Sequence, residues 1–200
     1  MIGRFTLFGQ LATLWTIRLS LACYACVLIA LLTEPTEPTD GVDDESEEAP
    51  GPNRLGPFTL PQWWAISCGL FLIHVGLAFH YYHHWSHARA FEHTAAETQR
   101  LLGVRFGYGV YVNHLFAIVW TMDGALWLLA PQLHARRSRW LHRIVHGFLF
   151  FIAFNGAVIF EDGPVRWFGI FVTLLIAGLW LRRQLLVSTR VNSSPTMDAS

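Results

Sequence analysis

The sequence predicts an all-α integral membrane protein, a bundle of about five transmembrane helices. Hydrophobic residues make up 53% of the 200-residue chain and its mean hydropathy is +0.36. Only 14% of the residues are charged, compared with about 25% in an ordinary soluble domain. The apolar residues also occur in runs of about 20, the length at which a helix crosses a hydrocarbon core of roughly 30 Å.

Five apolar runs are expected to span the membrane: residues 11–32, 63–82, 107–130, 141–160 and 165–181. Proline marks two of their boundaries, because Pro61 precedes the second run and Pro131 ends the third. The sequence Glu-Asp-Gly-Pro at positions 161–164 is typical of a tight turn. We therefore expect the last two spans to form an antiparallel helical hairpin.

The polar segments divide the chain into four parts. Eight of the 14 acidic residues lie between Glu34 and Glu48, in a proline-rich segment with almost nothing to bury. Such a composition predicts a disordered extramembrane linker. The expected parts are an N-terminal segment with the first helix at 1–32, the linker at 33–60, a four-helix transmembrane bundle at 61–183 with an amphipathic extension at 83–102, and a disordered C-terminal tail at 184–200.

Five spans also fix which segments share a membrane face. The N-terminus, residues 83–106 and the turn at Glu161 lie on one face, here named the first side. The linker, residues 131–140 and the C-terminus lie on the other, the second side. Arg136, Arg137, Arg139 and Arg143 favour a cytoplasmic second side.

The expected partner of the chain is a lipid bilayer, and we expect a multi-pass protein of a bacterial inner (plasma) membrane. All 14 basic residues are arginine. None of the basic blocks has the length or the mixture with aromatic residues that a nucleic-acid groove requires. The sequence identifies no protein partner.

Histidines gather after the second predicted span, at His80, His83, His84 and His87. On one continuous helix these four lie within roughly a third of the circumference, whereas His93 lies roughly 140° away. Imidazoles at this spacing can surround a zinc, iron or copper ion. The four are therefore candidate ligands of a transition metal, and the alternative is a solvated amphipathic continuation of the span.

Two histidine motifs resemble those of a known enzyme family. His80-x-x-His83-His84 is similar to the H-x-x-H-H box of membrane desaturases and hydroxylases, and His142-x-x-x-His146 is similar to their H-x-x-x-H box. This resemblance implies a di-iron oxygenase that acts on lipid chains. However, one crossing by the third span places the two boxes on opposite faces, too far apart to share two irons about 4 Å from each other. The oxygenase is kept as an alternative.

Polar residues inside the spans suggest a second site. Arg18, His74, Asn113, His114 and Asn155 lie at one depth, within roughly 5 Å along the membrane normal. Ionisable groups in a span usually face the bundle interior, so we predict one polar cluster. His74 and His114 are candidate axial ligands of a haem b, with Arg18 at a propionate. The alternative is a hydrogen-bonded structural core.

Asp123 is an isolated carboxylate about seven residues from the second side. It can serve as a proton-relay or ion site, or as a protonated core residue bonded to Thr121 or to a neighbouring helix. Cys23-x-x-Cys26 has the spacing of a redox or zinc pair, but its apolar surroundings favour two small buried side chains.

These observations give three hypotheses for function and leave enzymatic activity open. The first is a metal- or haem-binding membrane subunit with a role in electron transfer. The second is a small lipid-modifying di-iron oxygenase. The third is a structural or assembly subunit of a membrane complex, without catalysis.

Overall fold

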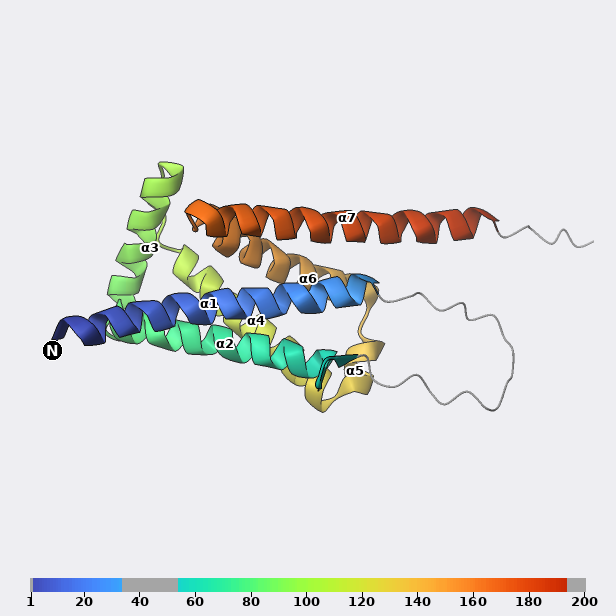
Figure 1. Ribbon diagram of the computed structural model, residues 1–200, viewed down its shortest axis with the longest axis horizontal. Helices are drawn as coiled ribbons and strands as arrows, with labels where there is room; N and C mark the ends of the chain where they lie inside the picture. The colour runs from blue at the N-terminus through green and yellow to red at the C-terminus, as the bar shows by residue number, and fades with distance from the viewer. Residues whose placement is uncertain (1, 34–53, 194–200) are drawn as a thin grey trace, which may run out of the picture.

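The computed structural model describes residues 2–33 and 54–193 (Figure 1). Its helices are α1 (Ile2–Thr33), α2 (Leu60–Tyr81), α3 (His87–Leu102), α4 (Gly109–Leu129), α5 (Pro131–Arg136), α6 (Arg139–Phe154) and α7 (Gly163–Ser193). A π-helical turn, η1 (Asn155–Ile159), continues α6, and the strands β1 (Arg54–Leu55) and β2 (Phe58–Thr59) form a short antiparallel hairpin.

Five helical segments of the described chain are long and apolar enough to cross a membrane. They are Leu7–Thr33, Leu60–Tyr81, Gly109–Leu129, Arg139–Ile159 and Gly163–Leu186. The predicted all-α fold is confirmed for the residues described, and a multi-pass membrane protein follows from the length and composition of these helices.

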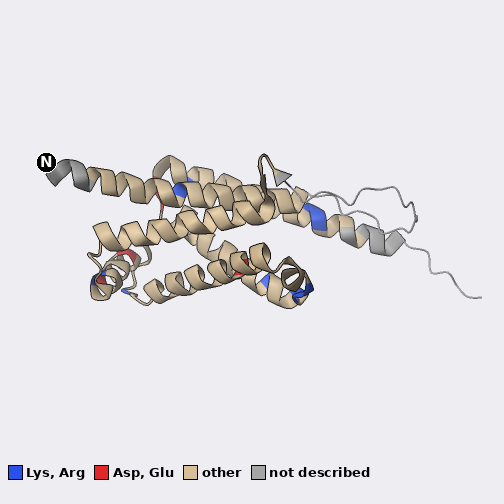
Figure 2. Cartoon of the chain, turned by 90° about the horizontal axis from the view of Figure 1, so that it is seen from below, with Lys and Arg blue, Asp and Glu red and all other residues tan. Residues whose placement is uncertain are grey.

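The long helices lie roughly along one axis, with α3 running across it, so that the bundle has two distinct ends (Figure 1). The N-terminus, α3 and the start of α7 lie at one end. The β hairpin, α5 and the far half of α7 lie toward the other. Charged residues lie mostly near these two ends, and the middle of the long helices is largely uncharged (Figure 2). We name these two ends the first-side end and the second-side end, after the membrane faces predicted for them.

Local sequence explains where several helices begin and end. Before α2, the Thr59 N–H donates to Gln62 Oε1 at 2.9 Å, which satisfies a backbone donor at the helix start. Before α6, Ser138 Oγ accepts from the Leu141 N–H at 3.2 Å. Helix α3 ends at Gly103, whose φ of +73° is a left-handed conformation that glycine adopts without strain.

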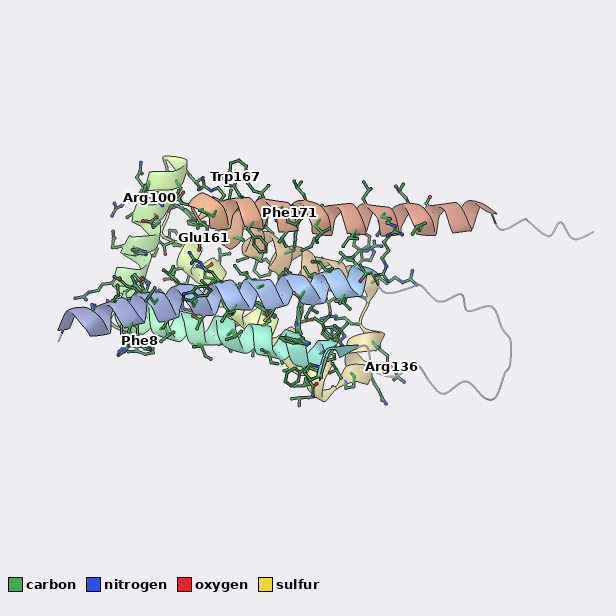
Figure 3. All side chains as sticks on the ribbon, viewed as in Figure 1. Phe8, Arg100, Arg136, Glu161, Trp167 and Phe171 are labelled. Atoms are coloured by element: carbon green, nitrogen blue, oxygen red, sulfur yellow. The ribbon has the colours of Figure 1, made fainter. Side chains whose placement is uncertain are left out.

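The core is aromatic and lies among α1, α2, α4 and α6. Its buried members include Tyr24, Trp64, Phe71, Phe116 and Trp120, whose rings contact one another at tilted or edge-on angles. Many large apolar side chains elsewhere are exposed, as lipid-facing residues are. Trp167, for example, projects from the outer side of α7 (Figure 3).

Small polar residues allow α1 and α2 to approach closely along the core. Ser20 Oγ donates to the Ser67 carbonyl, and Ser67 Oγ donates to the Ser20 carbonyl, both at 2.7 Å. Both serines are fully buried. At the first-side end of the same contact, Gly9 packs directly against the ring of Tyr81.

Two predicted boundaries differ from the structure. Residues 54–59, placed in the disordered linker, form the β hairpin, because Trp63 Nε1 donates to the Leu55 carbonyl at 2.6 Å and the Phe58 ring packs edge-on against Trp63. The helix predicted to end at 181 continues to Ser193. Residues 34–53 and 194–200 of the predicted linker and tail lie outside the described residues.

A further difference concerns the partners of α7. It runs antiparallel to α6, as predicted, but contacts α1 as extensively as η1 (Figure 1). Near the second side, Arg183 Nη1 donates to the Leu31 carbonyl at 2.6 Å. A cation at the carboxyl end of a helix satisfies a free carbonyl and complements the helix dipole, so Arg183 fastens α7 to the end of α1.

Candidate functional site

A buried ion pair lies at the second-side end of the bundle. Asp123 projects from α4, and its Oδ1 accepts a hydrogen bond from Arg137 Nη1 at 2.5 Å. The side chains of Asp123 and Arg137 are 1% and 8% exposed. His134 Nε2 lies 3.6 Å from the same carboxylate oxygen. The expectation that Asp123 is isolated is therefore wrong, and Thr121 is not its partner, since Thr121 Oγ1 donates to the Ala117 carbonyl.

The chain between α4 and α6 explains how Arg137 reaches Asp123. Pro131 lacks the N–H that would continue α4, so the chain turns there and begins the short helix α5. After α5, Arg137 has an extended backbone, with φ −60° and ψ 140°, and Ser138 then caps α6. This reversal folds α5 back over the end of α4 and turns the Arg137 guanidinium toward the carboxylate.

Arg137 also contacts two histidines. Its Nη2 lies 3.1 Å from both His134 Nε2 and His142 Nδ1. A guanidinium nitrogen can only donate, so both imidazole nitrogens accept and neither carries a proton. Burial, and next the charge of Arg137, lowers the pKa of His134, although Asp123 acts in the opposite direction. The His134 ring also stacks on Trp127, with the ring centroids 5.2 Å apart.

His146 extends this group from the surface toward the core. Its ring centroid lies 4.2 Å from that of His142, which is exposed, and 5.3 Å from that of Trp64, which is buried. We name Asp123, His134, Arg137, His142 and His146 the second-side polar site. It joins the end of α4, α5 and the first two turns of α6.

Unsatisfied polar atoms concentrate in and beside this site. Among the described residues, the buried side-chain atoms without a hydrogen-bond partner are Arg18 Nε, Tyr24 Oη, Trp64 Nε1, Trp120 Nε1, Asp123 Oδ2, Arg137 Nε and both ring nitrogens of His146. All but the first belong to the second-side polar site or to three core aromatic residues. Of these, Trp64 packs against His146, and Tyr24 and Trp120 contact Trp64. A buried polar group left unpaired costs about 1–3 kcal/mol. These unpaired groups lower the stability of the fold. Their concentration here therefore indicates that the polar side chains serve a function.

Comparison with protein-family models, curated proteins and solved structures finds no match. The function of the chain is therefore inferred from its own residues. The sequence pointed to Asp123, and to His142 and His146 within the oxygenase box, but not to His134 or Arg137. Arginines beside a span are usually topology signals. The sequence signal that could have identified this pair is an arginine a few residues after a span that contains a single carboxylate.

The predicted stripe of four histidines is not formed. Helix α2 ends at Tyr81, the chain turns, and α3 begins at His87 in a new direction (Figure 1). Trp85 Nε1 donates to His80 Nδ1 at 3.4 Å, whereas the His83 ring faces His93, with the centroids 5.4 Å apart. His84 lies in the turn with a positive φ. In the part of the chain that is described, no three His, Cys, Asp or Glu side chains are arranged to hold a metal ion.

The predicted mid-depth cluster is not formed either. Arg18 lies 3.6 Å from Glu161, and His74 Nδ1 bonds the Thr13 carbonyl of α1 at 2.8 Å. His114 and Asn155 bond carbonyls of their own helical turns, at Val110 and Phe151. Residues at a common depth share a position along the membrane normal. Their side chains can still point in different directions around their helices.

The remaining predicted candidates are also separated. The side chain of Asn113 is exposed, so it is not a buried polar residue. His74 faces α1, and the His114 ring lies 5.7 Å from His87 of α3, so the two do not face each other as haem ligands.

The two boxes that resemble those of the desaturases lie at opposite ends of the bundle. The first ends α2 and the second begins α6. Helix α4, of 21 residues, lies between them and is about 30 Å long. They cannot share one di-iron centre in this arrangement. Cys23, Cys26 and Cys68 are free thiols in the described chain.

Proposed function

We propose that the chain is a multi-pass protein of a bacterial inner membrane that takes up and releases protons at the second-side polar site. The observation that carries this proposal is the Asp123 carboxylate, 1% exposed, held between Arg137 and His134. Ionisable residues within spans are expensive to bury and often belong to proton relays. Histidine is the side chain that exchanges protons most readily near neutral pH.

In this proposal His142 and His146 form the path from water to the interior. Exposed His142 accepts a proton from water on the second side at Nδ1, and the hydrogen bond from Arg137 Nη2 to that nitrogen opens. The Nε2 proton of His142 then passes to His146, whose ring is its close neighbour and whose two nitrogens have no protein partner. His142 is left neutral with its proton on Nδ1, and the positive charge passes transiently to His146. The net change is one proton taken up from water, and no electron is transferred.

Arg137 has a positioning role in this relay. Its Nη2 holds His142 and His134 by their ring nitrogens, and its Nη1 neutralises Asp123. An uncompensated carboxylate at this depth would be strongly unfavourable. The guanidinium therefore compensates the buried carboxylate and, before a proton arrives, holds His142 in the tautomer with its proton on Nε2.

Electron transfer through a metal or haem b has less support, because the candidate ligands His74 and His114 bond separate partners. A Soret band in the purified protein would favour haem over the proton relay. If the purified protein shows no Soret band and the His146 ring shows no proton exchange, the structural subunit is favoured.

The relay is tested by ¹⁵N nuclear magnetic resonance of the full chain with labelled histidine, in detergent micelles. The rate at which the His146 ring N–H exchanges with water is measured in wild type and in His142→Phe. We expect the variant to exchange about 100-fold or more slowly, as when a positioned acid–base group is removed. His84→Phe, an exposed histidine outside the site, is the matched control. Equal exchange at His146 in wild type and His142→Phe would rule out the relay.

A further inference from the structure

A pair of histidines lies at the opposite, first-side end of the bundle. His87 is the first residue of α3 and is exposed, and His114 lies in the second turn of α4. Their ring centroids are 5.7 Å apart. Two imidazoles bound to one ion with metal–nitrogen distances of about 2.0–2.1 Å have ring centres roughly 5–6 Å apart. The observed separation fits a shared metal.

The hydrogen bond of His114 fixes which nitrogen is available. Its Nδ1 lies 2.6 Å from the Val110 carbonyl oxygen, which can only accept. Nδ1 therefore carries the proton, and in the neutral ring Nε2 has a free lone pair. Histidines that bind metals usually donate their other ring N–H to a carbonyl or carboxylate in this way, which fixes the ring and raises its basicity.

The structure around the pair is fixed by packing and by the backbone. The His114 ring packs edge-on against Phe79, and the His87 ring lies 5.2 Å from that of Tyr111. The turn before His87 contains two non-glycine residues with positive φ, His84 at 48° and Trp85 at 58°. Each such residue is strained by roughly 1–3 kcal/mol, and strain of this kind concentrates at functional sites.

The charges nearby favour transition metals over magnesium or calcium. The two carboxylates of α3 are engaged in ion pairs, Glu92 with Arg105 and Glu97 with Arg100. The pair therefore offers nitrogen ligands, which suit copper, nickel and zinc.

We propose that His87 and His114 form a two-histidine site for a divalent transition metal, with water in the remaining positions, which links α3 to α4. Copper binds such ligands more tightly than nickel or zinc. The site has two protein ligands, in keeping with the lack of any three-ligand group among the described residues. It is independent of the second-side polar site.

The test is Cu²⁺ binding to the purified, untagged full chain in detergent, followed by calorimetry and by electron paramagnetic resonance. Wild type should bind one ion at this site with two nitrogen ligands in the spectrum. His87→Ala and His114→Ala should each remove one nitrogen ligand from the Cu²⁺ spectrum. Loss of a group that only orients a metal ligand weakens metal binding roughly 10–100-fold, so loss of a ligand itself should weaken Cu²⁺ binding by more than that.

Two other histidines provide controls. His84→Ala and His93→Ala should leave both the affinity and the two-nitrogen spectrum unchanged. His87 and His114 are both exposed, so both alanine variants should fold. A two-nitrogen spectrum that persists in His87→Ala, or that is lost in His93→Ala, would overturn the proposal, the latter by assigning the metal to the His83–His93 pair.

Discussion

Arg137 and Asp123 are 14 positions apart in the chain and form an ion pair that is almost completely enclosed. The pair joins the loop after α5 to the end of α4. In such a pair the attraction between the charges offsets the loss of hydration only while both partners are present. The pair is therefore a sensitive point of the fold as well as the centre of the second-side polar site.

Removing only the arginine should be strongly destabilising. In Arg137→Gln the Asp123 carboxylate stays buried without its cation, and the free energy of unfolding should fall by about 3–5 kcal/mol. Adding Asp123→Asn should restore part of this loss, since the stranded charge is then gone. Denaturant unfolding in detergent measures both effects. Arg136→Gln, next along the chain and pointing away from the bundle (Figure 3), should change stability little.

The stability of the second-side end should depend on pH through His134. Its pKa is lowered in the folded protein, so the unfolded chain binds more protons in the range between the two pKa values. Stability is therefore full above the unfolded value of about 6.5 and falls as the pH decreases below it. Thermal unfolding should show a smaller decrease in His134→Gln than in wild type. A pH dependence unchanged by His134→Gln, but reduced by the control His84→Gln, would contradict this assignment.

The close contact of α1 and α2 should tolerate loss of a hydroxyl better than added bulk. Ser20→Ala removes one hydrogen bond to Ser67, worth on average about 0.6 kcal/mol between transmembrane helices. Ser20→Leu must separate the helices and should cost about 1–3 kcal/mol. Ala22→Leu, which adds the same bulk at an exposed position, is the control. Equal effects of the two leucine variants would show that the α1–α2 contact is not close-packed in the membrane.

Reporter fusions should confirm the two ends of the bundle as the two membrane faces. Fusions after Arg100 in α3 and after Asp162 before α7 should report the same face. A fusion after Arg137 should report the opposite face (Figure 1). If the fusions after Arg100 and Arg137 report one face, α4 does not cross the membrane and the five-span arrangement is wrong.

The sequence predicted the helices well because each span needs only a long apolar run, a property local to that run. It predicted the break between α2 and α3 poorly. The spacing of His80, His83, His84 and His87 fits one helical face, and the left-handed backbone at His84 and Trp85 has no glycine to signal it.

The polar sites required information that a linear pattern does not contain. Residues at one depth, such as His74 and His114, point in directions set by the rotation of each helix within the bundle. The partner of Asp123 was equally hidden, because its position depends on how tightly the chain reverses at Pro131. The residues that pair across helices could therefore be identified only from the packed structure.

The contact of α7 with α1 has a consequence for the biogenesis of the protein. Arg183 and its acceptor Leu31 are 152 positions apart, so the surface of α1 that contacts α7 faces lipid until α7 has been synthesised. The core among α1, α2, α4 and α6 does not depend on that event, since the buried aromatic residues lie within those four helices. Assembly is therefore expected in two stages, with α7 added to a bundle of α1, α2, α4 and α6 that is already packed.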